Sequence, residues 1–167
     1  MSTADAPVTR AVLSLGSNLG DRRAHLAAAL ATLTARVTVD AVSSVYRTPP
    51  WGPVPQGDYY NLTVAARAEL DPYGWLALCR ELERNAGRVR DIRWGPRTLD
   101  ADVVMVDEVV SVDPDLTLPH PRAHERAFVL LPWMEIEPFA QIPGHGPIGD
   151  LLADLATAEI TVVGRVS

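Results

Sequence analysis

The sequence predicts an α+β fold with a ferredoxin-like βαββαβ core. Segments with strand-like alternation or β-branched composition are interleaved with segments of helical periodicity, in the order β-α-β-β-α-β. The chain has 167 residues, of which 47% are hydrophobic, enough for one domain with its own core. In such a fold an antiparallel sheet has helices on one face, and we expect the substrate site on the other face and extra helices near the C-terminus.

The first half of the predicted core contains two strands around one helix. Residues 8–15 have the apolar composition of a strand, and residues 37–46 have it as well. Asp21 is a suitable N-cap for a helix over residues 22–34, where leucines at helical spacing form one apolar stripe. Four prolines within residues 47–57 prevent regular strand pairing, so this segment is predicted to be a loop.

The second half repeats the pattern. Residues 59–70 alternate as a strand, and the pair Asp71-Pro72 is typical of a helix start, here a helix that runs to residue 86. The short β-branched run 99–106 predicts the last core strand.

The remaining elements lie after the core. Residues 108–112 are expected to pair with the end of the 99–106 strand as a hairpin. Helices are expected within residues 122–133 and over residues 148–156, followed by a short strand at 160–163.

Composition limits the domain organisation and the compartment. We expect a single domain over residues 8–163 and a loose tail over residues 1–7. No apolar run approaches the roughly 20 residues of a membrane span. Cys79 is the only cysteine, so no intrachain disulfide can form, and we expect a cytoplasmic protein.

Charge limits the partners. The formal net charge of -6 disfavours a general nucleic-acid surface. All fifteen basic residues are arginines, and a P-loop kinase or a protein kinase needs a lysine at its nucleotide site. Any nucleotide phosphate must therefore be held by arginine, histidine, a metal ion or backbone groups.

The most informative segment is residues 87–102, in which four arginines surround Trp94 and two aspartates follow. Arginine forks clamp phosphate oxygens, and the tryptophan offers a flat apolar face to a ring. On a strand, Asp100 and Asp102 share one face, with Cα atoms roughly 6.5–7 Å apart. Their oxygens could converge on two metal ions about 3.5–4 Å apart. The alternative is a solvated strand end with two acids on its open face.

Four sequence blocks resemble the 6-hydroxymethyl-7,8-dihydropterin pyrophosphokinases, enzymes of the folate pathway. The blocks are residues 15–20 (LGSNLG), 44–50 (SVYRTPP), 87–102 (GRVRDIRWGPRTLDAD), and 118–122 with 126–130 (LPHPR and RAFVL). They occur in the order of the family. The resemblance implies transfer of pyrophosphate from ATP to the hydroxymethyl group of the pterin with release of AMP, assisted by two Mg²⁺ ions. We expect a monomer whose partners are ATP and the pterin, without nucleic acid or membrane.

The resemblance also implies roles for individual residues. Asp100 and Asp102 would bind both Mg²⁺ ions, and Arg88 and Arg97 would stabilise charge on the phosphates during catalysis. Six residues would surround the pterin, Asn61 at its edge and two aromatic rings at its faces: Thr48, Pro49, Tyr59, Asn61, Trp94 and Phe128. Seven residues would contact ATP: Glu83, Arg88, Arg90, Arg97, Thr117, His120 and Arg126.

Two rival functions fit parts of the pattern. A ferredoxin-like sheet with arginines and aromatic residues could bind RNA, but the chain is acidic and lacks the aromatic strand motif of RNA-recognition domains. A Mg²⁺-dependent phosphohydrolase could use the same two aspartates. Taken alone, Phe128 resembles a core residue and His120 a loop histidine.

Overall fold

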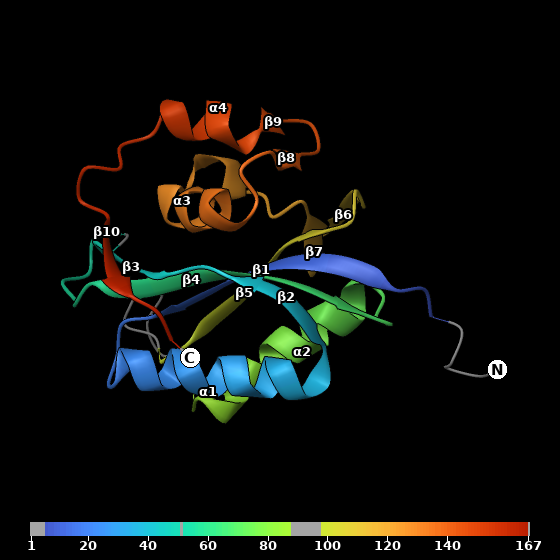
Figure 1. Ribbon diagram of the computed structural model, residues 1–167, viewed down its shortest axis with the longest axis horizontal. Helices are drawn as coiled ribbons and strands as arrows, with labels where there is room; N and C mark the ends of the chain where they lie inside the picture. The colour runs from blue at the N-terminus through green and yellow to red at the C-terminus, as the bar shows by residue number, and fades with distance from the viewer. Residues whose placement is uncertain (1–5, 51, 88–97, 167) are drawn as a thin grey trace.

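The chain forms three layers, with a sheet between two pairs of helices. The computed structural model describes residues 6–50, 52–87 and 98–166. Helices α1 (Arg22–Arg36) and α2 (Pro72–Asn85) cover one face of the sheet. Helices α3 (Ala127–Ile136) and α4 (Ile148–Ala153) lie on the other side, with α3 next to the sheet (Figure 1). The extra C-terminal helices are therefore present, and they share their face of the sheet with the predicted site.

The main sheet has six strands, all of them antiparallel to their neighbours. Its strands are β1 (Thr9–Ser17), β2 (Thr38–Val42), β3 (Val45–Thr48), β4 (Tyr59–Ala68), β5 (Asp100–Val106) and β10 (Thr161–Gly164). The strands follow the order β10-β3-β4-β1-β5, and β2 also pairs with β4. Strand β1 is thus central, between β4 and β5.

The single strand predicted over residues 37–46 is divided into β2 and β3. At the break, the Ser43 N–H donates to the Thr63 carbonyl (2.9 Å), and the Thr63 N–H donates to the Ser43 hydroxyl (2.9 Å). The hydroxyl in turn donates to the Ser44 carbonyl at 2.7 Å. A side-chain oxygen has replaced a backbone acceptor of the ladder, so regular pairing stops there and resumes at Val45.

The prediction that residues 108–112 form a hairpin with the end of the 99–106 strand is wrong. Strand β6 (Ser111–Asp113) pairs with β7 (Leu116–Leu118) in a separate small sheet, and not with β5. Strand β5 ends instead in a turn, where Asp107 has a φ of 44° and the Val109 N–H donates to the Val106 carbonyl. A further small sheet, β8 (Gln141–Ile142) with β9 (Gly146–Pro147), was not predicted.

Helix starts follow the predicted capping residues. Asp21 accepts a hydrogen bond from the Ala24 N–H (3.0 Å) at α1, and Asp71 accepts one from the Gly74 N–H (2.7 Å) at α2. Helix α3 starts within the predicted segment 122–133 and continues to Ile136, and residues 123–125 before it form a separate 3₁₀ turn, η2 (Ala123–Glu125). Among the described residues, no helix is long and apolar enough to span a membrane. The domain limits at residues 8 and 163 stay a prediction.

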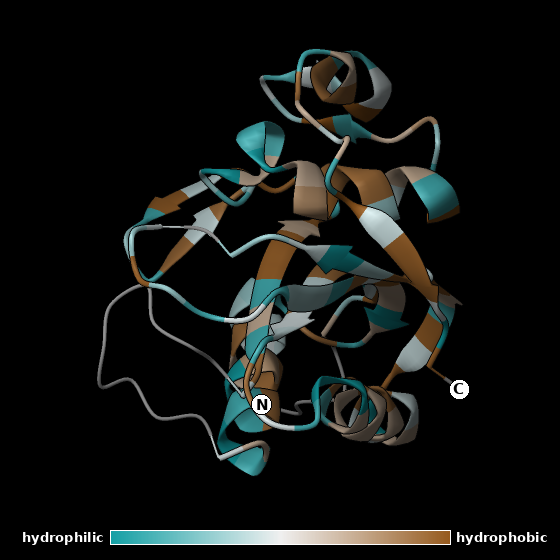
Figure 2. Ribbon diagram, turned by 90° about the vertical axis from the view of Figure 1, so that its left-hand side faces the viewer, coloured by the Kyte–Doolittle hydropathy of each residue, from teal (hydrophilic) through white to brown (hydrophobic). Residues whose placement is uncertain are grey.

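Two apolar cores lie on the two faces of the sheet. The larger packs β1, β4 and β5 against α1 and α2, around the fully buried Leu13, Leu15 and Trp75. The smaller packs α3 and α4 against β1 and β5, around Val12 and Trp133. The ribbon is accordingly hydrophobic along much of the central strands and of α3 (Figure 2). The face of the sheet that carries α3 thus has an apolar part, while Ser14, Asn61 and Thr63 on the same face are polar and buried.

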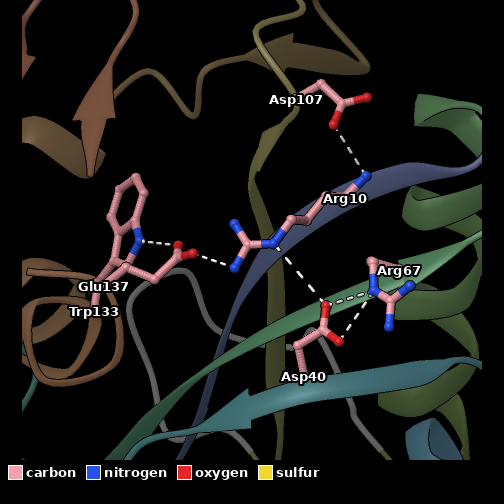
Figure 3. Close-up of polar contacts among 6 residues, drawn as sticks. All are labelled: Arg10, Asp40, Arg67, Asp107, Trp133 and Glu137. Carbon is pink, nitrogen blue, oxygen red and sulfur yellow. Dashed lines mark hydrogen bonds and ion pairs between the residues drawn. The ribbon is translucent and has the colours of Figure 1, made fainter. Parts of the chain in front are cut away.

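A polar network fixes the C-terminal end of α3 on the sheet (Figure 3). The Arg10 guanidinium of β1 pairs with Glu137, and the Trp133 indole N–H donates to the other oxygen of that carboxylate at 2.8 Å. On its other side, Arg10 lies 4.0 Å from Asp40, which also accepts two hydrogen bonds from Arg67 Nε (2.9 and 3.0 Å). These contacts connect α3 to β1, β2 and β4.

Glu135 makes a second connection, to the start of β3. Its carboxylate accepts hydrogen bonds from the Tyr46 hydroxyl (2.6 Å) and the Ser44 N–H (2.9 Å), and it pairs with Arg165 (3.3 Å). Partial burial raises the pKa of Glu135, but the two hydrogen bonds and the Arg165 charge outweigh burial and hold that pKa below its ordinary value of 4.5. The charged form of Glu135 therefore stabilises the fold.

Replacing this carboxylate with an amide should make the fold less stable in a pH-dependent way. We expect Glu135→Gln to lower the free energy of unfolding by about 1–2 kcal/mol at neutral pH, since two hydrogen bonds to a charged acceptor are weakened. A group with a lowered pKa contributes above its unfolded value and loses its contribution as pH falls through the folded value. The difference between wild type and variant, measured by urea unfolding at neutral pH and in acid well below pH 4.5, should be smaller in acid. An equal difference at both pH values would contradict this role.

Candidate active site

The strand register places polar side chains in two rows on the face of the sheet that carries α3. In the first row, Gly16 of β1 lies between Asn61 of β4 and Asp100 of β5. In the second row, Ser14 lies between Thr63 and Asp102. The alternation predicted for β5 is confirmed, because Leu99, Ala101 and Val103 belong to the core on the opposite face.

Asn61 is held at the start of the site by a neighbouring hydroxyl. Its Nδ2 donates to Thr48 Oγ1 at 2.6 Å, and the two side chains are 4% and 3% exposed. Asn61 belongs to the first polar row and Thr48 is the last residue of β3, while Pro49 follows β3 and is partly exposed. A buried amide with one of its protons already committed has a fixed plane, and it can offer its remaining donor and acceptor to a ligand.

Tyr59 connects this region to the acidic residues. Its ring lies beside Gly16, and its hydroxyl donates to Asp100 Oδ2 at 3.5 Å, a long contact. Tyr59 and Asp100 are both partly buried. The predicted pterin residues of β3 and β4 therefore lie on the same face as the predicted metal ligands of β5.

Asp100 and Asp102 fit a Mg²⁺ site that a substrate completes. Both are half-buried and lie on one face of β5. Over residues 6–50, 52–87 and 98–166, no group of three or more His, Cys, Asp and Glu side chains could hold a metal by itself. Mg²⁺ commonly binds through one or two carboxylates and takes its other ligands from phosphates and water. Two carboxylates are thus a sufficient protein contribution.

The start of α3 brings a cation and an aromatic ring to the same face. Arg126 is the N-cap residue of α3, and its guanidinium carbon lies 5.4 Å from the centre of the Phe128 ring. Burial lowers the pKa of Arg126, and the negative charges of Asp102 and Asp100 act in the opposite direction. Within the described part of the chain, its buried Nε has no hydrogen-bond partner. A partly desolvated arginine beside two carboxylates is suited to an anion that also carries metal ions.

His120 lies beside β5, where its backbone N–H donates to the Val104 carbonyl at 2.8 Å. Burial lowers the pKa of its imidazole to about 4, with a further contribution from the charges of Arg126 and Arg122. The ring is therefore neutral at physiological pH. Nδ1 accepts a hydrogen bond from the Arg122 N–H at 3.2 Å, so the proton of the neutral ring is on Nε2. His120 can thus donate a hydrogen bond without adding a charge.

With this geometry in place, comparison with known proteins decides the family. The model of the family "7,8-dihydro-6-hydroxymethylpterin-pyrophosphokinase" matches residues 12–138. The chain belongs to this pyrophosphokinase family. The match includes the described residues of both polar rows, and the family resemblance read from the four sequence blocks is confirmed.

Curated relatives agree over most of their length. A protein of Mycobacterium tuberculosis (strain ATCC 25618 / H37Rv) is 44% identical over 165 residues, covering 91% of this chain and 87% of the relative. A protein of Methylorubrum extorquens is 48% identical over 140 residues, covering 83% and 89%. Both are named 2-amino-4-hydroxy-6-hydroxymethyldihydropteridine pyrophosphokinase.

Solved structures show the same fold at low identity. The Plasmodium falciparum HPPK-DHPS protein crystallised with pterin and p-hydroxybenzoate is 14% identical, with a TM-score of 0.74 over 98% of this chain. A triple mutant of that protein with pteroate has a TM-score of 0.76 at 15% identity. This chain spans about half the length of each, 48% and 49%. At such identities the likeness concerns the fold alone.

The structure separates the residues predicted to contact ATP. Arg126 lies within reach of the charges of the two aspartates, and the backbone of His120 is bound to Val104 of the same strand, β5. Glu83 is buried on α2, the helix on the opposite face of the sheet, and Thr117 of β7 donates its hydroxyl to the Asp113 carbonyl at 3.0 Å. Both α2 and β7 contact β5, so Glu83 and Thr117 belong to elements that pack against the strand of the two aspartates. Their contact with ATP stays a prediction.

Four predicted residues lie outside the described residues: Arg88, Arg90, Trp94 and Arg97. Their roles at the phosphates and at the pterin stay predictions.

Sequence reasoning missed the position of Gly16. The strand predicted over residues 8–15 stops too early, because Gly16 and Ser17 are the last residues of β1, and both pair with β4. A glycine at the end of an alternating apolar strand is a recognised sign that another group approaches the backbone closely. This signal is present in the sequence but does not identify the approaching group.

The neutral state of His120 can be measured directly. In a proton NMR titration of the imidazole Cε1 resonances, identified with a His120→Gln variant, we expect the His120 signal to titrate near pH 4 and not near 6.5. Because this pKa is lower in the folded than in the unfolded protein, His120 should reduce stability as pH falls from 6.5 towards 4. A midpoint near 6.5 would show that the ring is solvated and charged in acid like a surface histidine.

Proposed function

We propose that this protein transfers pyrophosphate from ATP to the hydroxymethyl group of 6-hydroxymethyl-7,8-dihydropterin in folate biosynthesis, and releases AMP. Family membership and the printed names of the curated relatives support the activity. ATP as the donor and Mg²⁺ as the metal are proposed from the family resemblance and from the chemistry of the side chains.

The observation that carries the proposal is the shared row of Asn61, Gly16 and Asp100. Asn61 and Asp100 lie two strands apart on one face, which corresponds to roughly 9.5 Å between their backbones. A two-ring heterocycle can span that distance between its polar edge at Asn61 and its hydroxymethyl group near the carboxylates. The register of the sheet thus supports a site for both the ring and the phosphates.

The ring would be recognised at its edge and at its faces. The fixed amide of Asn61 offers hydrogen bonds in the plane of the ring, and Tyr59 and Phe128 offer aromatic surface. Trp94 is proposed at the second face from the family resemblance. A site that forms hydrogen bonds to ring heteroatoms strongly rejects analogues that lack them.

The phosphates would be held by charge. Asp100 and Asp102 would hold Mg²⁺, which when bound neutralises phosphate charge and orients the reacting oxygens. Arg126 would pair with phosphate oxygens through its buried Nε, and His120 would donate from Nε2 without adding charge. Arg88 and Arg97 are proposed to assist from the family resemblance, with Arg90.

The reaction needs positioning more than covalent chemistry. The hydroxyl oxygen of the pterin attacks the β-phosphorus, a new O–P bond forms, and the bond between the β-phosphorus and the oxygen of AMP breaks in line. The hydroxyl proton is released to water as the new bond forms. Asp100 and Asp102 would hold the Mg²⁺ that neutralises phosphate charge. Arg126 would offset the negative charge that remains on the phosphates.

A product assay tests this function and separates it from hydrolysis. Purified protein with ATP, Mg²⁺ and 6-hydroxymethyl-7,8-dihydropterin should form AMP and the pterin diphosphate in equal amounts, as measured by chromatography. Neither AMP nor phosphate should form when the pterin is left out. Release of phosphate that does not depend on the pterin would instead indicate a phosphohydrolase.

In the same assay, Asp100→Asn and Asp102→Asn should each lower AMP formation at least about a hundredfold, because each removes a metal-binding charge. Circular dichroism should stay that of the wild type, since both side chains lie on a half-open sheet face. Glu108→Gln is the matched control, an acid in the exposed turn after β5, and it should keep the wild-type rate. A folded Asp100 or Asp102 variant with near-normal turnover would exclude the metal role.

The aromatic contact can be tested with the two phenylalanines of the chain. Phe128→Ala should raise the KM for the pterin about tenfold through lost stacking and burial, and should change the KM for ATP little. Phe139→Ala removes a ring that is 92% exposed and should change neither constant. An equal rise of both KM values in the Phe128 variant would place the ring outside the pterin pocket.

A further inference from the structure

Gly16 is where the backbone of β1 and the side chain of Asn61 come closest. A Cβ atom built on Gly16 would lie 2.5 Å from Asn61 Oδ1 and 3.4 Å from Cδ1 of the Tyr59 ring. Real Cβ atoms do not approach an oxygen so closely, so any side chain at position 16 would displace the amide. The backbone of Gly16 does not have a positive φ, so space alone requires the glycine.

The amide has no free direction in which to move. Asn61 is 4% exposed, and its Nδ2 is held by Thr48 Oγ1 at 2.6 Å on the side of β3. Its Oδ1 therefore faces β1, directly over Gly16. Rotation of the amide away from a new Cβ would break the Thr48 hydrogen bond, and a flip of the amide would exchange its donor and acceptor.

We propose that Gly16 is a specificity-determining position: its missing side chain leaves room over β1 for Asn61 Oδ1, so that Thr48 can hold the Asn61 carboxamide in one orientation. In this orientation one N–H of Nδ2 is used by Thr48, and the other N–H and the Oδ1 lone pairs remain side by side in one plane. The matching ligand is a planar nitrogen heterocycle whose edge carries an acceptor next to an N–H donor.

This assignment rests on the proposed function, since the ring is that of the pterin substrate. It assigns different roles to three residues of the pocket. Asn61 makes the contact, and Thr48 and Gly16 are positioning residues that fix the direction of its donor and acceptor. A glycine within a strand weakens pairing, so Gly16 lowers the stability of the fold. In return, it leaves the space that fixes the orientation of the Asn61 amide.

The test is a double-mutant cycle on the KM for the pterin. Gly16→Ala should raise the pterin KM about tenfold, the size of one lost hydrogen bond in a buried site, and change the KM for ATP less than about twofold. In an Asn61→Ala background, adding Gly16→Ala should change the pterin KM less than about twofold, because no amide remains to be displaced. Thr48→Val should mimic Gly16→Ala, since it frees the amide from the other side.

Controls separate the possible outcomes. Gly149→Ala adds a Cβ that meets only the flexible end of Met134 at 3.2 Å, so it should leave both KM values unchanged. If Gly16→Ala raises the pterin KM equally with and without the Asn61 side chain, the proposal is overturned. A large fall in melting temperature in Gly16→Ala also overturns it, because Gly16 would then be needed for the fold. If the wild type itself forms no pterin diphosphate, the proposed function fails, whereas normal wild-type turnover with an inert Gly16→Ala refutes only this inference.

Discussion

The register of β1 between β4 and β5 is the constraint on which the site depends. The side chains of Leu13 and Leu15 are fully buried against α1 and α2, so the residues between and after them must face the other way. This places Ser14 and Gly16 between the polar residues of β4 and the acidic residues of β5. A slip by one residue would turn every side chain of β1 to the opposite face, at the cost of exposing the core. Core burial thus fixes the alignment of the site.

Helix α3 supplies the second part of the site from the same face. Its first residues carry Arg126 and Phe128 towards the polar rows, and its last turns are tied to the sheet by Glu135 and by the Glu137–Arg10 pair. Glu135 connects α3 with the start of β3, which ends at Thr48. The helix that carries the cation and the strand that orients Asn61 are therefore held by one carboxylate. We expect loss of the Glu135 contacts to weaken binding of both ATP and the pterin.

Local sequence signals predicted the parts of this structure that depend on local physics. Asp21 and Asp71 cap their helices because a short side-chain acceptor reaches an otherwise unpaired N–H of the first turn, and the alternation of β5 follows from strand geometry. The break at Ser43 could not be predicted, because it depends on a hydroxyl that meets Thr63 from a distant strand. Asp107, a non-glycine residue with a φ of 44°, ends β5 in a turn, and β6 pairs with β7 in a separate sheet, which the residue types of 108–112 do not indicate.

The candidate site likewise has features that the sequence predicted and features that depend on tertiary structure. Asp100, Asp102 and Asn61 were identified from residue type, spacing and family resemblance, and the structure places them on one face. The position of α3 on that face and the approach of Asn61 to Gly16 are tertiary facts, which no periodicity within one strand encodes. The family resemblance named the residues around the pterin, but it did not show that Gly16 and Thr48 orient one of them.

We propose that one face of the sheet holds the ring at Asn61 and, through Mg²⁺, the phosphates at Asp100 and Asp102. A crystal structure with Mg²⁺, a non-hydrolysable ATP analogue and the pterin would test it most directly. The claim predicts a pterin edge within hydrogen-bond distance of Asn61, metal ions on Asp100 and Asp102, and the hydroxymethyl oxygen directed at the β-phosphorus. A pterin bound on the α1 and α2 side of the sheet, or metal ions held by other residues, would contradict it.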